Sequence, residues 1–213
     1  MSLLLLTQLL AAAALLFCLA AFAVRLRRFL SLARPADRSQ PRGSVDAGVA
    51  YALTLGMMPW AKESTRRHAL AYLRGVGFHV TVFLCLALLL ISPWLELVPT
   101  LVRNTLAVIT AAGALLAFLG FLSRFLEKSL KALSTPDDYF AILLISLFLA
   151  AGAAALWMQV LLPIFYVVSS LVLVYMPLGK IRHCIYFAFS RLFFGRFFGR
   201  RGVYPHSQQE VIA

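Results

Sequence analysis

Residues 139–179, YFAILLISLFLAAGAAALWMQVLLPIFYVVSSLVLVYMPLG, form the longest part of the chain without a charged side chain. These 41 residues would measure roughly 60 Å as one straight helix, about twice the hydrocarbon thickness of a membrane. Near the middle, Trp157, Gln159 and Pro163 combine an interfacial aromatic ring, a polar amide and a helix breaker. The pattern therefore predicts two membrane-spanning helices joined by a turn.

Three further segments have the length and apolar character of single membrane spans: residues 1–24, 75–95 and 104–123. Across all 213 residues, 62% are hydrophobic and 13% are charged, with a mean hydropathy of +0.88. Soluble domains have about 25% charged residues, so this composition excludes a soluble enzyme domain, and a disordered chain is far less apolar. The sequence predicts an all-α integral membrane protein, a bundle of five transmembrane helices.

The basic residues are distributed unevenly between the two sides of this predicted bundle. The chain has 20 Lys and Arg against 8 Asp and Glu, a formal net charge of +12. Every basic residue except Arg103 follows the first, third or fifth predicted span. Because cytoplasmic loops are enriched in Lys and Arg, we expect the N-terminus outside and the C-terminus in the cytoplasm. The first span has its basic cluster after it, unlike a typical signal peptide.

The segments around the spans are strongly basic. We expect transmembrane helix one at 1–24, a basic cytoplasmic loop with an interfacial helix at 25–74, transmembrane helices two to five at 75–191, and a basic cytoplasmic tail at 192–213. Near the C-terminus, RLFFGRFFGRRGVYP (191–205) alternates aromatic pairs with Arg and Gly, which is typical of a segment that binds anionic lipid headgroups. A solvated loop with a short helix is the alternative for residues 45–74, and no nucleic-acid partner is expected.

The chain contains four histidines: His68, His79, His183 and His206. His79 follows Arg74 by five residues at the cytoplasmic end of the second span, and His183 precedes Arg191 by eight on an apolar extension of the fifth. At 1.5 Å per residue, both imidazoles lie on the order of 10 Å from the inner basic boundary. Two histidines at matched depth on different helices can ligate one haem b iron from both faces. The alternative is a pair of neutral histidines bonded to neighbouring helices.

Three cations near these histidines suit the carboxylates of a haem. Lys180 and Arg182 interrupt the apolar pattern beside His183, and Arg74 lies about one turn from His79. Guanidinium and ammonium groups neutralise carboxylates such as haem propionates. The alternative is that these long side chains extend to the lipid headgroups.

Two smaller patterns accompany the histidines. Gly75 and Gly77 leave room ahead of His79 for a flat macrocycle, although close helix packing explains small residues equally well. His68, together with Lys62 and Glu63, has the chemistry to handle protons for a quinone near the inner surface, and a solvated helix face is the alternative.

Three motifs resemble a known family: GFHVTVFLCL (77–86), STPDDYFAILLISLFLAAG (134–152) and VYMPLGKIRHCIYF (174–187). The chain is similar over most of residues 60–190 to the gamma subunit of respiratory nitrate reductase. It also resembles the related small membrane cytochromes b of sulfite-reductase-linked, heterodisulfide-reductase-like and multihaem-cytochrome redox complexes. The resemblance implies five spans with the N-terminus outside, which the charge distribution predicts independently.

The family's haem ligands carry over only in part. In the nitrate reductase subunit, two helices each carry two haem-binding histidines; the inner pair corresponds to His79 and His183. At the outer pair this chain has Leu89 and Phe165. The resemblance therefore implies one haem b on the cytoplasmic side. Because the family's quinol chemistry is associated with the outer haem, no quinone ligand is assigned.

Together these features favour a membrane cytochrome b subunit of a respiratory redox complex in the bacterial cytoplasmic (inner) membrane. We expect it to pass electrons between menaquinone, or a periplasmic cytochrome subunit, and an iron–sulfur subunit on the cytoplasmic face, with other membrane subunits beside it. It would not be catalytic alone. A haem-free structural anchor is the main alternative; a small transporter is disfavoured because the spans have almost no polar residues near mid-membrane.

Overall fold

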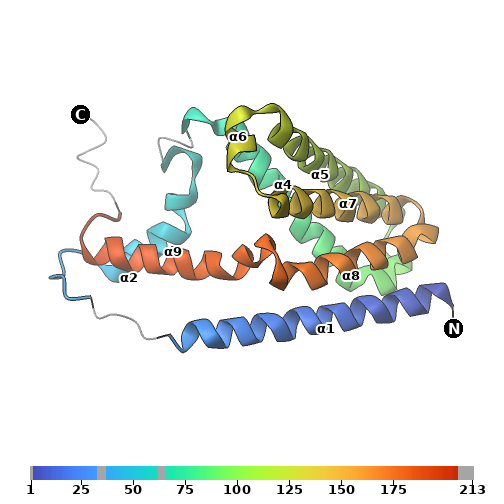
Figure 1. Ribbon diagram of the computed structural model, residues 1–213, viewed down its shortest axis with the longest axis horizontal. Coiled ribbons are helices and arrows are strands. Elements are labelled where there is room, and N and C mark those ends of the chain that lie inside the picture. The colour runs from blue at the N-terminus through green and yellow to red at the C-terminus, as the bar shows by residue number, and fades with distance from the viewer. Residues whose placement is uncertain (1, 33–36, 62–65, 206–213) are drawn as a thin grey trace. The chain divides into compact units, whose positions relative to one another are not determined.

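The computed structural model describes residues 2–32, 37–61 and 66–205 (Figure 1). The described residues are mainly helical, and no β-strand occurs among them. Five helical segments are long and apolar enough to cross a membrane: Leu3–Leu30, Ala69–Leu97, Thr100–Leu126, Pro136–Trp157 and Gln159–Leu178. The predicted all-α fold with five candidate spans is thereby confirmed, whereas the orientation of the termini stays a prediction.

The described helices follow one another closely along the chain. The α-helices are α1 (Leu3–Leu30), α2 (Val45–Leu53), α4 (Ala69–Ile91), α5 (Thr100–Leu126), α6 (Lys128–Leu133), α7 (Pro136–Trp157), α8 (Leu162–Leu178) and α9 (His183–Arg200). Short 3-10 turns lie between them: η1 (Leu55–Met57), η2 (Pro59–Ala61), η3 (Ser92–Leu97), η4 (Gln159–Leu161) and η5 (Lys180–Arg182). Contacts divide the chain into a bundle unit, Met1–Val24 with Leu73–Arg182, and a loop–tail unit, Arg25–Tyr72 with His183–Ala213.

The turn within the long uncharged run occurs where the sequence predicts it. Helix α7 ends at Trp157, and Met158 has an extended backbone. After η4, helix α8 begins at Leu162 with Pro163 in its first turn, where the missing N–H of proline costs no hydrogen bond. The run thus forms two spans rather than one long helix.

Helices α7 and α8 form the interior of the bundle unit. In their most apolar windows 56% and 50% of the residues are buried, against 22–28% for the other three spans. Phe148 and Phe165 are fully buried and stack with ring centroids 5.7 Å apart. Gly152 of α7 lies so close to Cys85 of α4 that any side chain would overlap the Cys85 Sγ. Small residues of this kind allow close helix contact in membranes.

A short network of hydrogen bonds connects α1, η3 and α8 in the bundle unit. Gln8 Nε2 donates to the hydroxyl of Tyr166 at 3.3 Å. The Ser92 hydroxyl lies 2.9 Å from the Tyr166 hydroxyl and 2.8 Å from the Leu89 carbonyl oxygen. Since a carbonyl only accepts and a hydroxyl has one proton, Ser92 donates to Leu89 and accepts from Tyr166. The hydroxyl protons of Ser92 and Tyr166 are therefore placed.

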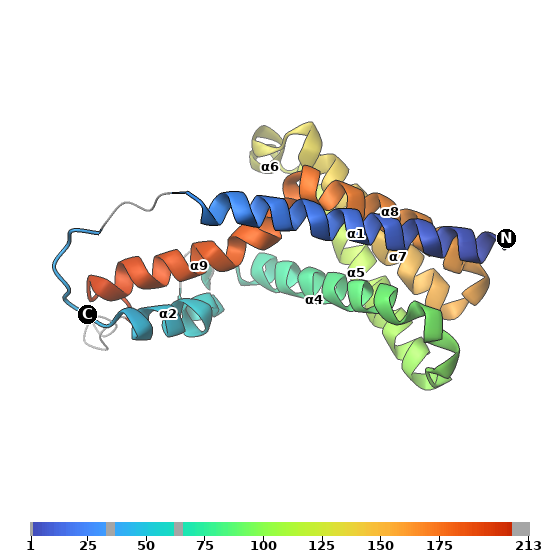
Figure 2. The same ribbon diagram turned by 90° about the horizontal axis from the view of Figure 1, so that it is seen from below.

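In the loop–tail unit α2 and α9 lie side by side, as Figures 1 and 2 both show. A Cβ atom at Gly195 would lie 2.5 Å from Cα of Val49, and one at Gly199 would lie 2.6 Å from the Ser44 carbonyl oxygen. Only glycine at these positions lets the two backbones touch. Helix α9 ends next to Gly202, whose φ of 70° is the left-handed conformation that glycine adopts without strain.

The segments expected from composition, with the helical bundle ending at residue 191, stay a prediction. The structure adds a relationship between the basic loop and the basic tail: α9 is continuous from His183 to Arg200 and packs on α2, so the two belong to one unit. Residue 191 lies inside α9.

Candidate functional site

His79 lies in the third turn of α4 and is exposed on the surface of the described chain. Its Nδ1 atom lies 2.7 Å from the carbonyl oxygen of Gly75. A carbonyl can only accept, so this contact places the imidazole proton on Nδ1 and the lone pair of the neutral ring on Nε2. A backbone carbonyl that orients the ring through one nitrogen is the common arrangement for a metal-binding histidine.

The two glycines ahead of His79 have different surroundings. A Cβ atom at Gly75 would meet no described atom within 4 Å, whereas one at Gly77 would lie 3.4 Å from Leu116 Cδ1 of α5. Gly77 therefore faces α5, but a methyl group would fit there, so helix packing does not require glycine at this position. The surface at Gly75, which supplies the acceptor for His79, is open to a flat group.

Arg74 is five residues before His79 on the same helix. At about 100° per residue, the two side chains leave α4 roughly 140° apart. They therefore point to different sides of the helix, so a propionate contact from Arg74 requires its long side chain to reach around α4.

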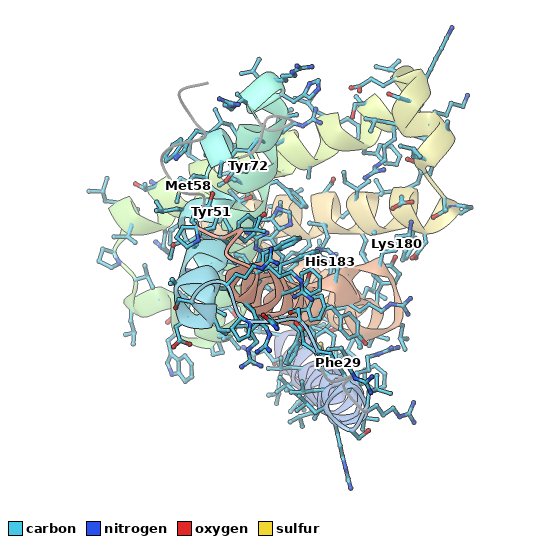
Figure 3. The ribbon with its side chains drawn as sticks, turned by 90° about the vertical axis from the view of Figure 1, so that its left-hand side faces the viewer. Phe29, Tyr51, Met58, Tyr72, Lys180 and His183 are labelled. Carbon is cyan, nitrogen blue, oxygen red and sulfur yellow. The ribbon has the colours of Figure 1, made fainter. Side chains whose placement is uncertain are left out.

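His183 is the first residue of α9 (Figure 3). Helix α8 ends at Leu178, Gly179 has an extended backbone, and η5 precedes His183. Pro177, which has no N–H, and Gly179 weaken the helix here. The sequence argument counted eight residues from His183 to Arg191, and these residues are continuous within α9, whereas η5 and Gly179 separate them from α8. His79 belongs to the bundle unit and His183 to the loop–tail unit; their shared ligation of one iron stays a prediction.

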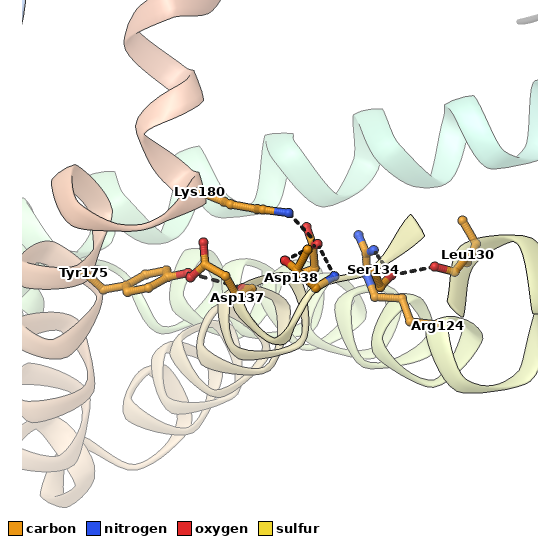
Figure 4. Close-up of polar contacts among 8 residues, drawn as sticks. Arg124, Leu130, Ser134, Asp137, Asp138, Tyr175 and Lys180 are labelled. Atoms are coloured by element: carbon orange, nitrogen blue, oxygen red, sulfur yellow. Dashed lines mark hydrogen bonds and ion pairs between the residues drawn. The ribbon is translucent and has the colours of Figure 1, made fainter. Parts of the chain in front are cut away.

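Lys180, one of the three cations expected to face a haem propionate, has a partner within the chain (Figure 4). Its Nζ lies 2.5 Å from Oδ2 of Asp138, whose side chain is 17% exposed. The same carboxylate accepts hydrogen bonds from the backbone N–H and the hydroxyl of Thr135, at 2.8 and 2.9 Å, and so caps the start of α7. The charge of Lys180 is therefore balanced without a cofactor. Arg182, two residues further on, is exposed.

Three neighbouring contacts join α5, α6, α7 and α8 at the same end of the bundle unit. The hydroxyl of Tyr175 donates to the Asp137 carboxylate. Arg124 Nη1 donates to the Ser134 hydroxyl at 2.8 Å, and the Tyr139 hydroxyl donates to the Arg124 carbonyl oxygen at 3.0 Å. Sequence reasoning missed this cluster. Its available signal was the adjacent pair of acidic residues in STPDD at the start of a span, which had been read only as part of a family motif.

The proposed proton-handling group is only partly within the described residues. His68 lies just before α4, is exposed, and accepts the backbone N–H of Tyr72 at its carbonyl oxygen. The Tyr72 hydroxyl in turn donates to the Met57 carbonyl oxygen at 2.6 Å, close to Met58 and Tyr51 in Figure 3. Lys62, Glu63 and His206 lie outside the described residues.

The arginines of the tail are used mainly inside the loop–tail unit. Arg191 donates to the carbonyl oxygens of Ala52, near the end of α2, and Gly56, in η1, at 2.6–3.1 Å. Arg200 donates two hydrogen bonds to the Ser39 carbonyl oxygen, and Arg201 forms a bidentate ion pair with Asp37. Three of the four arginines in residues 183–213 thus hold the loop in place, and the fourth, Arg196, is exposed.

Among residues 2–32, 37–61 and 66–205 there is no group of three or more His, Cys, Asp or Glu arranged to hold a metal ion. A haem held by two histidines does not need such a group. Comparisons with protein-family models, curated proteins and solved structures find no match to this chain. The family resemblance therefore depends on the three motifs quoted above.

Proposed function

We propose that this protein is the membrane cytochrome b subunit of a respiratory redox complex in the bacterial cytoplasmic membrane. In this proposal His79 and His183 hold one haem b near the cytoplasmic face. Electrons pass between the quinone pool, or a periplasmic cytochrome, and an iron–sulfur subunit on the cytoplasmic side. The N-terminus lies outside and the basic loop–tail unit lies inside, as the positive-inside rule requires.

The main support is the hydrogen bond between His79 and Gly75. It holds the imidazole in the tautomer with its lone pair on Nε2, and His79 is exposed in the described part of the chain, with the Phe78 ring edge-on to it at 5.1 Å. An ionisable residue in a membrane helix is costly to keep, which makes it a candidate for a function. The open surface at Gly75 is compatible with a flat ring beside the histidine.

The surrounding residues have defined tasks in this proposal. Arg182, exposed and adjacent to His183, is the best placed of the three cations to neutralise a propionate. Lys180 already pairs with Asp138, and Arg74 leaves α4 on another side. Haem, when bound, would supply a one-electron carrier, and the imidazoles of His79 and His183 would hold its iron.

The residues at the family's outer haem positions favour one haem in this protein rather than two. Leu89 and Phe165, at the positions of the family's outer ligands, are 8% and 0% exposed. Phe165 is packed against Phe148 and beside Gly152, so apolar side chains fill the space around it. Menaquinone remains a proposed partner with no assigned residues.

The cationic loop–tail unit suits an acidic partner such as the iron–sulfur subunit, because charge complementarity raises association rates and favours one partner over others. The second candidate function is a haem-free membrane anchor for a redox complex. One observation favours it: the pairing of Lys180 with Asp138 accounts for the cation next to the end of α8 without any cofactor.

A reduced-minus-oxidised absorption spectrum of the purified protein separates the two. The cytochrome proposal expects b-type bands with a haem-to-protein ratio near one, and His79→Ala and His183→Ala should each abolish them. His68→Ala is the matched control, because this exposed histidine precedes α4 and should leave the bands unchanged. Absence of bands in the wild-type protein would favour the anchor, and a ratio near two would exclude a single haem.

A further inference from the structure

Helix α9 has two contrasting faces. Gly195 and Gly199 lie on the face that contacts α2. At about 100° per residue, Phe193 and Phe197 leave the helix on the roughly opposite side, with Phe187 and Phe194 next to them. We refer to Phe187, Phe193, Phe194 and Phe197 as the Phe face. The repeated FFGR pattern of the sequence thus separates glycines and phenylalanines onto different sides of one helix.

The Phe face is largely uncovered. Phe187, Phe193 and Phe194 are 50%, 62% and 42% exposed. The ring of Phe193 stacks on that of Phe197 at 5.8 Å and lies edge-on to that of Phe194 at 6.2 Å, so these three rings form a contiguous surface. Phe197 is half-buried, and the Arg201 guanidinium lies over its ring at 3.5 Å. A large apolar patch on a protein surface marks a contact with a membrane or a partner. Helix α9 itself is not among the helices apolar enough to span a membrane.

The charge of the loop–tail unit indicates what covers this face. Its residues, 25–72 and 183–213, include 13 Lys and Arg against 4 Asp and Glu, and so carry most of the chain's net charge of +12. Among its described cations the exposed ones are Arg27, Arg28, Arg38, Arg42, Arg66, Arg67 and Arg196. A helix with aromatic residues on one side and basic groups around it is typical of segments that lie in the interface of an anionic membrane.

The chain also keeps α9 near the membrane surface. His183 follows Leu178, the end of a candidate span, by five residues, a reach of at most about 17 Å. Phe29, at the end of the candidate span α1, contacts Tyr186 and Phe189 of α9 with ring centroids 5.9 and 4.8 Å apart. Helix α9 is therefore tied to the ends of two apolar helices, which favours lipid over a soluble protein as its cover.

We propose that the Phe face inserts into the interface of an anionic lipid surface, with the exposed arginines of the loop–tail unit at headgroup level. The attraction depends on exposed cations such as Arg196, and not on Arg191, Arg200 and Arg201, which bind groups of this chain. The close contact of α2 with α9 holds the Phe face turned away from α2. This interfacial contact does not require haem and holds for either function considered above.

Tryptophan fluorescence of the full chain in lipid vesicles tests the proposal. In a background with Trp60, Trp94 and Trp157 replaced by Phe, Phe193→Trp places a single reporter on the Phe face, and Gln40→Trp places a control on an exposed loop of the same unit. In vesicles of phosphatidylcholine with phosphatidylglycerol, lipids brominated on their acyl chains should quench the reporter at 193 and not the one at 40. Acrylamide dissolved in the water should quench the reporter at 40 more strongly than the one at 193.

Each other result contradicts the proposal. Quenching at 193 by acrylamide alone would place the Phe face in water. Protection from both quenchers would mean that a protein surface, either a second copy or a partner, covers it. Equal quenching in vesicles of phosphatidylcholine alone would exclude the requirement for anionic lipid. If Phe193→Trp does not fold, Phe187→Trp provides a second reporter on the same face.

Discussion

The Nζ of Lys180 lies 2.5 Å from Oδ2 of Asp138, an ion pair between residues 42 positions apart in the sequence. The carboxylate caps the first turn of α7, and the ammonium belongs to the turn that follows α8. The ion pair thus joins the start of α7 to the turn that follows α8. It also balances a cation for which the sequence alone left two partners open, a haem propionate and the lipid headgroups.

We expect Asp138→Asn to lower the free energy of unfolding only modestly. The amide can still accept from the Thr135 backbone, so this change removes the ion pair and keeps the cap. Because the Lys180 side chain is 45% exposed, the pair should contribute at most about 1 kcal/mol.

Asp138→Ala removes the cap as well and should cost about 1 kcal/mol more. Thermal or denaturant unfolding in detergent, with Lys180→Met to complete a double-mutant cycle, measures both effects. A zero coupling energy between positions 138 and 180 would contradict the ion pair's contribution.

We expect Gly195→Ala to separate α2 from α9. The added Cβ would lie 2.5 Å from Cα of Val49, and backbone atoms cannot move aside as a side chain can. Overpacking of this kind costs about 1–3 kcal/mol. Hydrogen exchange of the α2 amides should become faster.

Gly77→Ala is the matched control for this change. Its Cβ would meet only the flexible end of Leu116 at 3.4 Å, and alanine stabilises a helix by up to about 1 kcal/mol relative to glycine. Equal exchange rates in α2 of the wild type and Gly195→Ala would show that the close contact is not needed.

We expect Tyr166→Phe to weaken the attachment of α1. The change removes the hydroxyl that accepts from Gln8 and donates to Ser92. Hydrogen bonds between membrane helices contribute about 0.6 kcal/mol on average and at most about 1.7. A double-mutant cycle with Gln8→Leu should give a coupling energy in this range, and additive effects would contradict the contact.

We expect the stability of the loop–tail unit to depend on Asp37 at acid pH. The hydrogen bonds from the Arg201 guanidinium, and then those from Ser39, hold the pKa of the Asp37 carboxyl well below its usual range. A lowered folded-state pKa means that the stabilisation is fully present above the usual value of about 3.9 and is lost as pH falls below it.

Limited proteolysis of the wild type and Asp37→Asn over a pH series measures this effect. The wild type should be more resistant at pH 7, and the difference should shrink in the acid range. Because the pair is exposed, added salt should reduce the difference too. If the wild type and Asp37→Asn differ in protease resistance by the same amount at every pH, the difference does not come from the charge on Asp37.

Local composition was enough to establish the class of this protein. A span needs only a contiguous apolar segment of the right length, so the five candidate spans and the turn after Trp157 follow from the residues in order. The same local patterns singled out His79 and His183 by residue type. They could not tell whether the fifth span continues to His183, because the apolar pattern resumes after a break at Gly179.

The tertiary structure decided which distant residues meet. Asp138 balances Lys180, glycines of α9 contact α2, and Arg191 binds carbonyl oxygens at the end of α2. The ion pair and the arginine hydrogen bonds leave no periodic signal, since they depend on how helices pack and not on spacing within one helix. The four-residue spacing of Gly195 and Gly199 indicates a face for close contact but does not identify α2 as its partner. For the same reason, the sequence could relate the +12 charge only to membrane topology. The tertiary structure shows that three of the basic residues, Arg191, Arg200 and Arg201, bond the loop to the tail.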